Sequence, residues 1–301
     1  MAWTDAGAIL AYRGGWRTVR LMPDPVAYRT FDRIADLLWT RRSTGARRLR
    51  ANLARVVDGR LDAAGLDDLT HRGLRSYLCY WCDAFRLPDW DAERTMTSVR
   101  VVGWEILESA MAAGGGAVGA LPHMGNWDHA GAYVIGSGVP VTTVAERLKP
   151  EAVYKQFLAF REGLGMTIYP LQGEQDVLGR LEQAVRRNCF VPLLADRDLT
   201  DRGVPVDLLG ERATMPAGPA ALALRTGAPL IPVSTWFEGA SPHHVLGLRF
   251  DDPIVVPDGT EAQRIQLMTQ RLADVFTARI REHPQDWHML QRVFTADLAP
   301  R

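Results

Sequence analysis

The chain has 301 residues, of which 47% are hydrophobic and 23% are charged, so it can bury a large core and is not a disordered polypeptide. Its formal net charge is zero, yet residues 1–60 contain twelve arginines and five aspartates, a local balance of +7. Three cysteines in a chain of this length argue against a disulfide scaffold and favour a reducing compartment.

The basic N-terminal segment suggests that the protein meets an anionic surface, either phospholipid or nucleic acid. The sequence contains no run of about 18 apolar residues, the length that predicts a membrane-spanning helix. Its N-terminus also lacks the charged and then apolar order of a secretory signal. We therefore expect a protein that stays in the cytoplasm.

The first 110 residues are expected to form helices. Two sets of residues recur at helical spacing on different faces near the N-terminus: Ile9, Tyr12, Trp16 and Val19, and Arg13, Arg17 and Arg20. An aromatic face beside an arginine face is typical of a helix in a membrane interface, but a helix packed on the protein body gives the same pattern. Further helices are expected around residues 31–38 and 49–56, where apolar residues again recur every three or four positions.

Cys79 and Cys82 form a C-x-x-C pair within a segment whose apolar residues have helical spacing. No second cysteine pair accompanies them, and no strand is expected just before them. The pair is therefore interpreted as part of a core helix rather than as a redox or zinc motif.

From residue 117 onward, expected strands alternate with expected helices. The strands are expected at 117–122, 139–146, 166–171, 189–196 and 228–237, and the helices at 125–138, 150–165, 173–188, 215–227 and 260–283. This alternation predicts an α/β fold, with a mostly parallel central sheet covered by helices on both faces. We expect one structural domain, made of a membrane-facing helical subdomain at 1–110 and an α/β core at 111–301.

The stretch "HMGNWD" places His123 at the end of the first expected strand of the core, where ligands bind in such sheets. Gly125 permits a tight turn and Asn126 can cap the next helix, so Asp128 lies in the first helical turn. Asp128 is expected to accept a hydrogen bond from the imidazole, which would make His123 a general base for an alcohol. A structural histidine that caps a loop is the alternative.

The same six residues match the H-x-x-x-x-D/E motif of the glycerolipid acyltransferase superfamily, in particular its lipid A biosynthesis branch. Within that branch the chain resembles the actinobacterial phosphatidylinositol mannoside acyltransferases. The resemblance extends through seven blocks in order: "YWCDAFRLP", "ALPHMGNWDHAG", "TTVAERLKPEAVY", "FREGLG", "LLADRDLT", "MPAGPAALAL" and "DWHML".

The resemblance implies that His123 deprotonates a sugar hydroxyl, which attacks an acyl-CoA thioester directly, while Asp128 orients the imidazole. Asp196 stands where these relatives have a glutamate thought to assist the histidine, and the shorter side chain leaves direct contact with His123 open. Asp198 is a second candidate for that role. Ion pairing at the surface among Asp196, Arg197 and Asp198 is the alternative.

Further substrate-binding candidates follow from the same resemblance and from charge. Glu146 and Arg161 match positions that line the substrate site in the family, and an arginine suits a phosphate or a polarised carbonyl. Arg202 and Arg225 are candidates for the phosphates of coenzyme A. Trp236, Trp287 and His288 are interpreted as structural residues, and His243 and His244 as surface residues.

The resemblance therefore implies an O-acyltransferase that moves a long-chain, palmitoyl-type acyl group to a mannose hydroxyl of a phosphatidylinositol mannoside. The implied partners are acyl-CoA as the donor substrate, this glycolipid and an anionic membrane surface, with no nucleic acid, metal or cofactor. The expected location is peripheral, on the cytoplasmic face of the plasma membrane. Three alternatives remain: another glycolipid acceptor, a lipid-binding protein without catalysis, and a metal-dependent hydrolase that uses His123, Asp128, His129 and Asp196 or Asp198.

Overall fold

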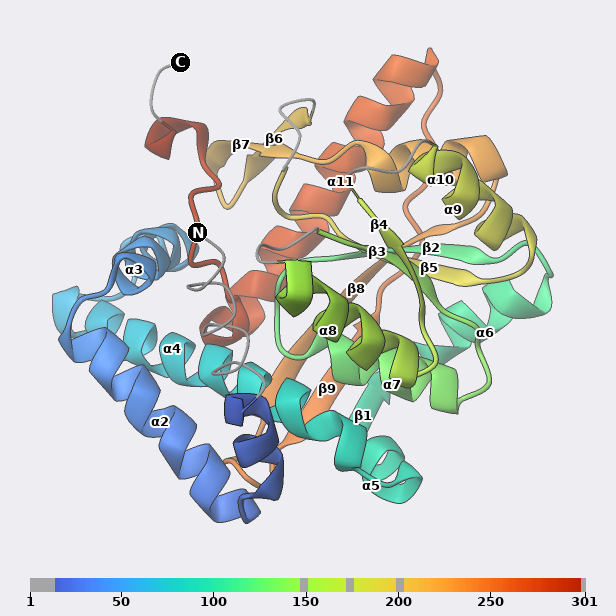
Figure 1. Ribbon diagram of the computed structural model, residues 1–301. Coiled ribbons are helices and arrows are strands. Elements are labelled where there is room, and N and C mark those ends of the chain that lie inside the picture. The colour runs from blue at the N-terminus through green and yellow to red at the C-terminus, as the bar shows by residue number, and fades with distance from the viewer. Residues whose placement is uncertain (1–13, 147–150, 172–175, 199–202, 299–301) are drawn as a thin grey trace.

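The computed structural model describes residues 14–146, 151–171, 176–198 and 203–298. At its centre lies a five-stranded sheet with the strand order β1-β9-β8-β2-β5 (Figure 1). Its strands are β1 (Val99–Val102), β2 (Ala117–Leu121), β5 (Phe190–Leu194), β8 (Leu230–Glu238) and β9 (Val245–Phe250). A parallel pair, β3 (Thr142–Ala145) and β4 (Thr167–Pro170), continues the sheet beyond β5 through a parallel bridge between Val141 and Phe190.

The strand directions confirm the prediction of a mostly parallel sheet. β2 runs parallel to both β5 and β8, and β1 runs parallel to β9. Only the β8–β9 pairing within this sheet is antiparallel among the described residues. The carboxyl ends of β2 and β5 therefore meet at one edge, which is where the sequence places His123 and Asp196.

Strand β2 shows why the centre of the sheet forms here. All five of its residues are buried, as expected for a strand covered on both faces. Val118 and Ala120 face one hydrophobic cluster, and Ala117 and Leu121 face another. Gly119 lies against the ring of Phe190, whose atoms would be 2.6 Å from an added Cβ, so a larger side chain would push the two strands apart.

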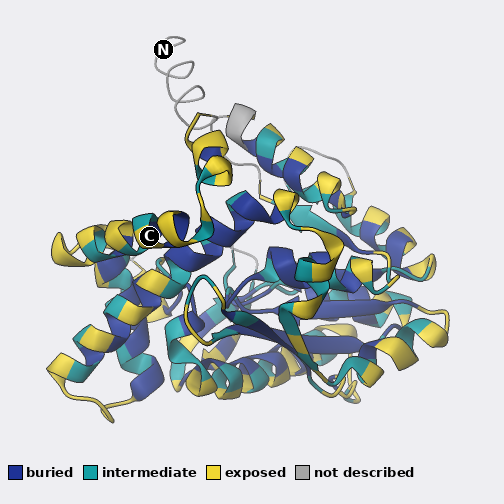
Figure 2. Cartoon of the chain, turned by 90° about the horizontal axis from the view of Figure 1, so that it is seen from below, coloured by how far each residue is buried: buried dark blue, intermediate teal, exposed yellow. Residues whose placement is uncertain are grey.

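Helices cover both faces of the sheet, as predicted (Figure 1). One face is covered by α9 (Val177–Arg186), α10 (Gly218–Thr226) and α11 (Glu261–Glu282). The other face is covered by α6 (Trp104–Ala112) and α7 (Trp127–Gly136), with α5 (Ala92–Thr97) and α8 (Glu151–Gly163) packed against α7. Figure 2 shows the strands mostly buried, between helices whose outer faces are exposed.

Three helices precede the core: α2 (Asp24–Thr40), α3 (Thr44–Val57) and α4 (Ala63–Arg86). Helix α4 packs against both α2 and α3, and it also contacts α7. The side chains of Ser43 and Asp62 cap α3 and α4 by accepting hydrogen bonds from backbone N–H groups in the first turn. In the described part of the chain, no helix is both long enough and apolar enough to cross a membrane.

The structure corrects the expectation for the N-terminal 110 residues in one place. Residues 99–102 form the edge strand β1 rather than a helix, and they pair with β9, a strand that the sequence pattern did not predict. The hairpin of β6 (Val204–Leu208) and β7 (Glu211–Met215) was also missed. Strands β1, β6 and β7 alternate exposed or half-buried residues with more buried ones, a weaker signal than the continuous apolar run of β2.

The aromatic face expected near the N-terminus points inward where it is described. Trp16 is 6% exposed, and its ring lies 4.9 Å from Phe85 and 5.5 Å from Phe157 between ring centroids. Its indole N–H donates to the carbonyl of Phe85. Residues 14–21 therefore pack on the protein body through Trp16, while Ile9, Tyr12 and Arg13 lie outside the described residues.

Candidate active site

The loop between β2 and α7 holds His123 at the carboxyl end of the sheet. Gly125 has φ +51° and lies against the backbone of Thr235, which would be 2.7 Å from an added Cβ, so only glycine allows this close passage. Asn126 caps α7 by accepting a hydrogen bond from the backbone N–H of His129 at 3.0 Å. The turn and cap expected from the sequence are both present.

Asp196, directly after β5, is the partner of the His123 imidazole. Nδ1 of His123 lies 2.5 Å from Oδ1 of Asp196, and the backbone N–H of His123 donates to Oδ2 at 2.9 Å. The Asp196 side chain is fully buried, whereas that of His123 is 26% exposed. The aspartate therefore reaches the imidazole directly, the contact that its short side chain had left open.

The ionisation of Asp196 determines which imidazole nitrogen is free. Burial alone would raise the pKa of Asp196, but the nearby charge of His123 and hydrogen bonds from His123 and Trp287 hold it below its ordinary value. An ionised carboxylate can only accept, so Nδ1 of His123 carries the proton that it donates. In the neutral imidazole Nε2 is then a proton acceptor, which is the arrangement of a general base.

The expectation that Asp128 orients His123 directly is wrong. In the described part of the chain, Asp128 accepts hydrogen bonds from Arg161 at 2.6 and 3.3 Å and from the hydroxyl of Tyr80 at 3.0 Å. Helix α7 turns this carboxylate toward α4 and α8, while the ring of Trp127 packs edge-on against His123. Burial lowers the pKa of Arg161, but the charges of Asp128 and Tyr80 and the hydrogen bonds with them together raise it above its ordinary value, so the guanidinium stays charged.

His123 and the Asp128–Arg161 pair line the same pocket. The pocket extends along the strands, from Leu121 and Leu194 at the carboxyl ends of β2 and β5 to Phe190 and Val141 at the amino-terminal side. The wall opposite the sheet is formed by α7. Polar groups thus gather at one end, and the rest of the lining is largely apolar.

The other predicted substrate residues divide into two groups. Glu146 lines the pocket beside Arg197, whose guanidinium lies 3.5 Å from it. Asp198 accepts a hydrogen bond from the backbone N–H of Gly203 and is not part of the pocket lining.

Of the two arginines proposed for coenzyme A phosphates, only one can be placed. Arg225 lies on α10, on the far face of the sheet, and pairs with Glu182 at 3.0 Å. It is therefore not brought to the pocket. Arg202 lies outside the described residues.

Several residues around His123 were not found by sequence reasoning. The indole N–H of Trp287 donates to Oδ2 of Asp196 at 2.9 Å, and the backbone N–H of His288 donates to the carbonyl of His123 at 2.7 Å. Tyr80 binds Asp128 from α4. The block "DWHML" was the available signal, but nothing in its spacing indicates which strand end it approaches.

The residues of the hydrolase alternative are not brought together as one site. His129 is buried and its Nε2–H donates to the carbonyl of Thr95 at 2.9 Å, away from the His123–Asp196 pair. Burial lowers the pKa of His129, so it stays neutral. The C-x-x-C interpretation agrees with the structure, in which Cys79 and Cys82 are free, buried residues of α4.

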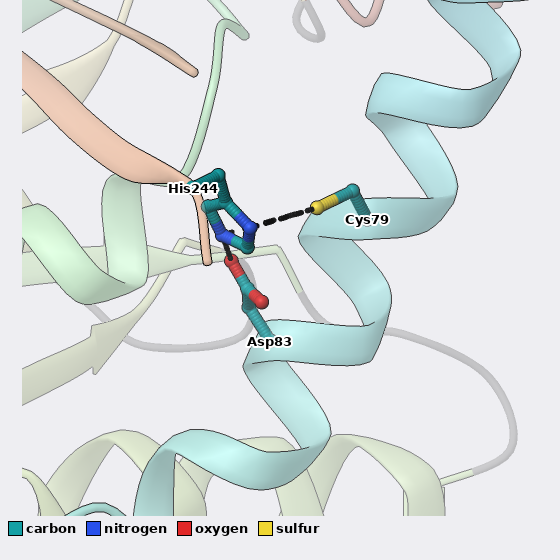
Figure 3. A group of neighbouring side chains, drawn as sticks. All are labelled: Cys79, Asp83 and His244. Carbon is teal, nitrogen blue, oxygen red and sulfur yellow. Dashed lines mark hydrogen bonds and ion pairs between the residues drawn. The ribbon is translucent and has the colours of Figure 1, made fainter. Parts of the chain in front are cut away.

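Within the described ranges, one group of residues has the ligand atoms for a metal ion: Cys79, Asp83 and His244, whose atoms lie within 4.8 Å of one another (Figure 3). Its polar atoms already have partners. Oδ2 of Asp83 accepts from His244 at 2.9 Å, and Oδ1 accepts from the hydroxyl of Tyr28 at 2.5 Å. His244 is thus a buried member of an ion pair rather than the surface residue expected from its loop sequence.

Comparisons with known proteins bear on this geometry. The family model described as bacterial lipid A biosynthesis acyltransferase matches residues 3–296. The phosphatidylinositol mannoside acyltransferase of Mycolicibacterium smegmatis is 46% identical over 292 residues, covering 96% of this chain and 92% of the relative. The protein of the same name from Mycobacterium tuberculosis is 44% identical over 292 residues, covering 96% and 89%.

Proposed function

The chain belongs to the bacterial lipid A biosynthesis acyltransferase family, and we propose that it moves a long-chain acyl group from coenzyme A to a mannose hydroxyl of a phosphatidylinositol mannoside. The family agrees with the O-acyltransferase expected from the motifs. The names of the two mycobacterial relatives support the mannoside acceptor.

One observation carries the proposed mechanism: His123 faces an apolar pocket while its Nδ1–H is held by the buried Asp196. Nε2 takes the proton of the mannose hydroxyl as its oxygen attacks the thioester carbonyl carbon. The tetrahedral oxyanion then collapses, the carbon–sulfur bond breaks, and the coenzyme A thiolate takes the proton from His123. The ester forms without a covalent enzyme intermediate.

The apolar part of the pocket suits a saturated acyl chain. Its lining follows strand β5 from Leu194 to Phe190, and five strand residues span about 16 Å. An extended hydrocarbon tail that lies along this direction would place its thioester near His123. This geometry supports a palmitoyl-type donor.

The Asp128–Arg161 pair forms part of the wall of the same pocket. Both side chains are nearly buried, at 2% and 18% exposed, so the pair is a fixed feature of the wall. Arg197 brings a second guanidinium, and its Nε has no hydrogen-bond partner among the described residues. We propose that Arg197, which pairs with Glu146, binds negative charge on the donor or on the tetrahedral intermediate.

We further propose that α2, rather than the Trp16 face, rests on an anionic membrane. Large apolar side chains are exposed on one face of this helix and just before it: Leu21, Val26, Ile34 and Leu37. Arg29 and Arg33 are exposed beside them. An apolar stripe flanked by arginines is the pattern of a helix that lies in a lipid interface.

This surface predicts the effect of a double substitution. Ile34→Ser with Leu37→Ser should reduce sedimentation with vesicles that contain phosphatidylinositol by about tenfold, since two apolar side chains on one face of α2 no longer enter the interface. Val255→Ser is the matched control, because Val255 is 72% exposed but lies far along the chain from α2. Equal binding of both variants would refute the assignment.

The function is tested with purified protein, radiolabelled palmitoyl-CoA and phosphatidylinositol mannoside, followed by identification of the labelled lipid. We expect label in the mannoside and none in phosphatidylinositol that lacks mannose. Label in a different glycolipid would correct the acceptor. Label in free fatty acid alone, lost on addition of a chelator, would favour the metal-dependent hydrolase. Palmitate binding with no turnover would favour a lipid-binding protein.

A further inference from the structure

The segment 286–288 lies against the loop that carries His123. Met124 and Trp287 form an isolated antiparallel bridge. The backbone N–H of Gly125 donates to the carbonyl of Asp286 at 3.0 Å, and that of His288 donates to the carbonyl of His123 at 2.7 Å. The loop is therefore bonded on one side to a segment more than 160 positions later in the sequence.

The side chain of Trp287 extends this connection to Asp196. Trp287 and Asp196 are both fully buried, and the indole N–H donates to Oδ2 at 2.9 Å. The same oxygen accepts from the backbone N–H of His123, while Oδ1 faces Nδ1 of the imidazole. Each oxygen of the carboxylate is thus held by a donor of known position, which leaves Asp196 a single orientation.

The segment itself is anchored to α4. Oδ1 of Asp286 accepts from the hydroxyl of Ser76 at 2.6 Å, and Ser76 in turn accepts from Nε2–H of His288 at 2.8 Å. Oδ2 of Asp286 accepts from the backbone N–H of Phe237 on β8. Trp287 is therefore fixed between two residues that are tied to α4 and to the sheet.

A buried carboxylate needs such donors to stay ionised. Burial raises the pKa of Asp196, and the charge of His123 together with the hydrogen bonds from His123 and Trp287 reverses this effect. A hydrogen bond to a charged group is stronger than one between neutral groups. Without the indole, Oδ2 keeps one donor, and the carboxylate can rotate away from Nδ1 or take up a proton.

We propose that Trp287 is a positioning residue for acyl transfer, whose indole N–H holds Asp196 in the orientation that keeps His123 a base. Trp287 is not part of the pocket lining, so in this proposal it acts only through Asp196. This inference rests on the proposed function for its kinetic consequence, but the indole–carboxylate contact can be tested without any substrate.

Trp287→Phe removes the indole N–H while keeping an aromatic ring in the core. We expect kcat to fall about tenfold or more, since the loss of a hydrogen bond to a charged group corresponds to about 10–100-fold in a rate constant. KM for acyl-CoA should stay within twofold. The matched control is Trp236→Phe, because Trp236 is 4% exposed and its indole N–H donates to Glu238 at 2.6 Å, away from His123. Equal loss of kcat in both variants would overturn the proposal.

The double variant separates positioning from packing. If Trp287 acts through Asp196, then Trp287→Phe added to Asp196→Ala should lower kcat by less than twofold beyond Asp196→Ala alone. A merely structural tryptophan would cause the same fold-loss in both backgrounds, and that result would contradict the proposal.

A spectroscopic measurement keeps the inference testable if a variant folds poorly or the reaction differs from the proposed one. In protein labelled with 15N-tryptophan, the indole N–H signal absent from Trp287→Phe identifies Trp287. That signal should move when Asp196 is replaced by alanine, while the Trp236 signal stays in place. An unmoved Trp287 signal would show that the indole does not bond Asp196, whatever the activity.

Discussion

The structure contains two histidine–aspartate pairs that resemble each other in bonding and differ in access. His123–Asp196 joins the ends of β2 and β5, with 2.5 Å between the bonded atoms, and His244–Asp83 joins the β8–β9 connection to α4 at 2.9 Å. The aspartate is fully buried in both pairs. The histidine side chain is 26% exposed in the first pair and 5% exposed in the second.

The surroundings of the second nitrogen make these pairs functionally different. The second nitrogen of His244 lies near Cys79 (Figure 3) and near Ser241. The ring of His244 packs edge-on against Phe237. Burial lowers the pKa of His244, but the charge of Asp83 and the hydrogen bond to it together raise the pKa above its ordinary value, which favours the protonated ring. His123 instead presents its second nitrogen to a pocket. A histidine–aspartate pair becomes a base for a substrate only where the free nitrogen can reach one.

We refer to His123–Asp196 as the accessible pair and to His244–Asp83 as the sealed pair. The largest effect is expected from a substitution that disrupts the accessible pair. His123→Ala removes the base, and we expect kcat for palmitoyl transfer to fall by about 10³-fold or more. His243→Ala is the matched control, because His243 is an exposed histidine next to the sealed pair. Initial rates with radiolabelled donor measure both, with circular dichroism to verify folding. Activity of His123→Ala within tenfold of the unchanged enzyme would remove His123 from the mechanism.

Sequence reasoning reached the accessible pair in part, because strand ends are local features. The apolar runs of β2 and β5 placed His123 and Asp196 at one edge of a parallel sheet. The choice of partner was wrong because Asp128 is five residues away in the sequence, whereas Asp196 is seventy-three residues away and nearer in space. Spacing along a helix does not reveal that the Asp128 carboxylate accepts a hydrogen bond from Arg161 instead.

The sealed pair could not be predicted from the sequence. His244 follows a loop segment rich in small residues and proline, which is typical of an exposed turn. Its burial depends on Asp83, which is 161 positions away on α4, and on strand β9, whose pattern did not predict a strand. The contact of Trp287 with Asp196 could not be predicted for the same reason, since Asp196 lies ninety-one positions earlier. Side-chain pairing across elements is determined by packing, not by local periodicity.

Breaking the sealed pair should affect stability rather than chemistry. Asp83→Asn leaves His244 buried beside a neutral amide, and removal of one partner of a buried pair typically costs about 3–5 kcal/mol. Burial raises the pKa of Asp83, but His244 and Tyr28 lower it below the ordinary value, so the stabilisation that Asp83 contributes is present above about pH 4 and is lost as the pH falls further. Urea unfolding at pH 7 measures the loss.

The control for that substitution is Asp68→Asn on the same helix, where Asp68 is 66% exposed and pairs with Arg72 at the surface. Its effect should be below about 0.5 kcal/mol. Where Asp83→Asn is folded, kcat should stay within a few-fold of the unchanged enzyme. Full stability with a large loss of kcat would mean that the sealed pair takes part in catalysis, against the comparison drawn above.

A smaller effect is expected at His288, another buried histidine, which extends the comparison. Burial and the charge of His123 lower its pKa to about 3, so it stays neutral. Below pH 6.5 the unfolded chain binds a proton at this residue that the folded chain does not, so stability falls as the pH falls. At pH 5 this loss of stability amounts to about 2 kcal/mol relative to pH 7.5.

His288→Gln keeps a donor for Ser76 and cannot titrate, so the variant should lose about 2 kcal/mol less stability over that interval. Burial raises the pKa of the neighbouring Asp286 to about 6, an opposite contribution that both proteins share and that cancels in their difference. Urea unfolding at the two pH values measures this difference, and parallel losses in the two proteins would show that His288 takes up its proton in the folded state as readily as in the unfolded one.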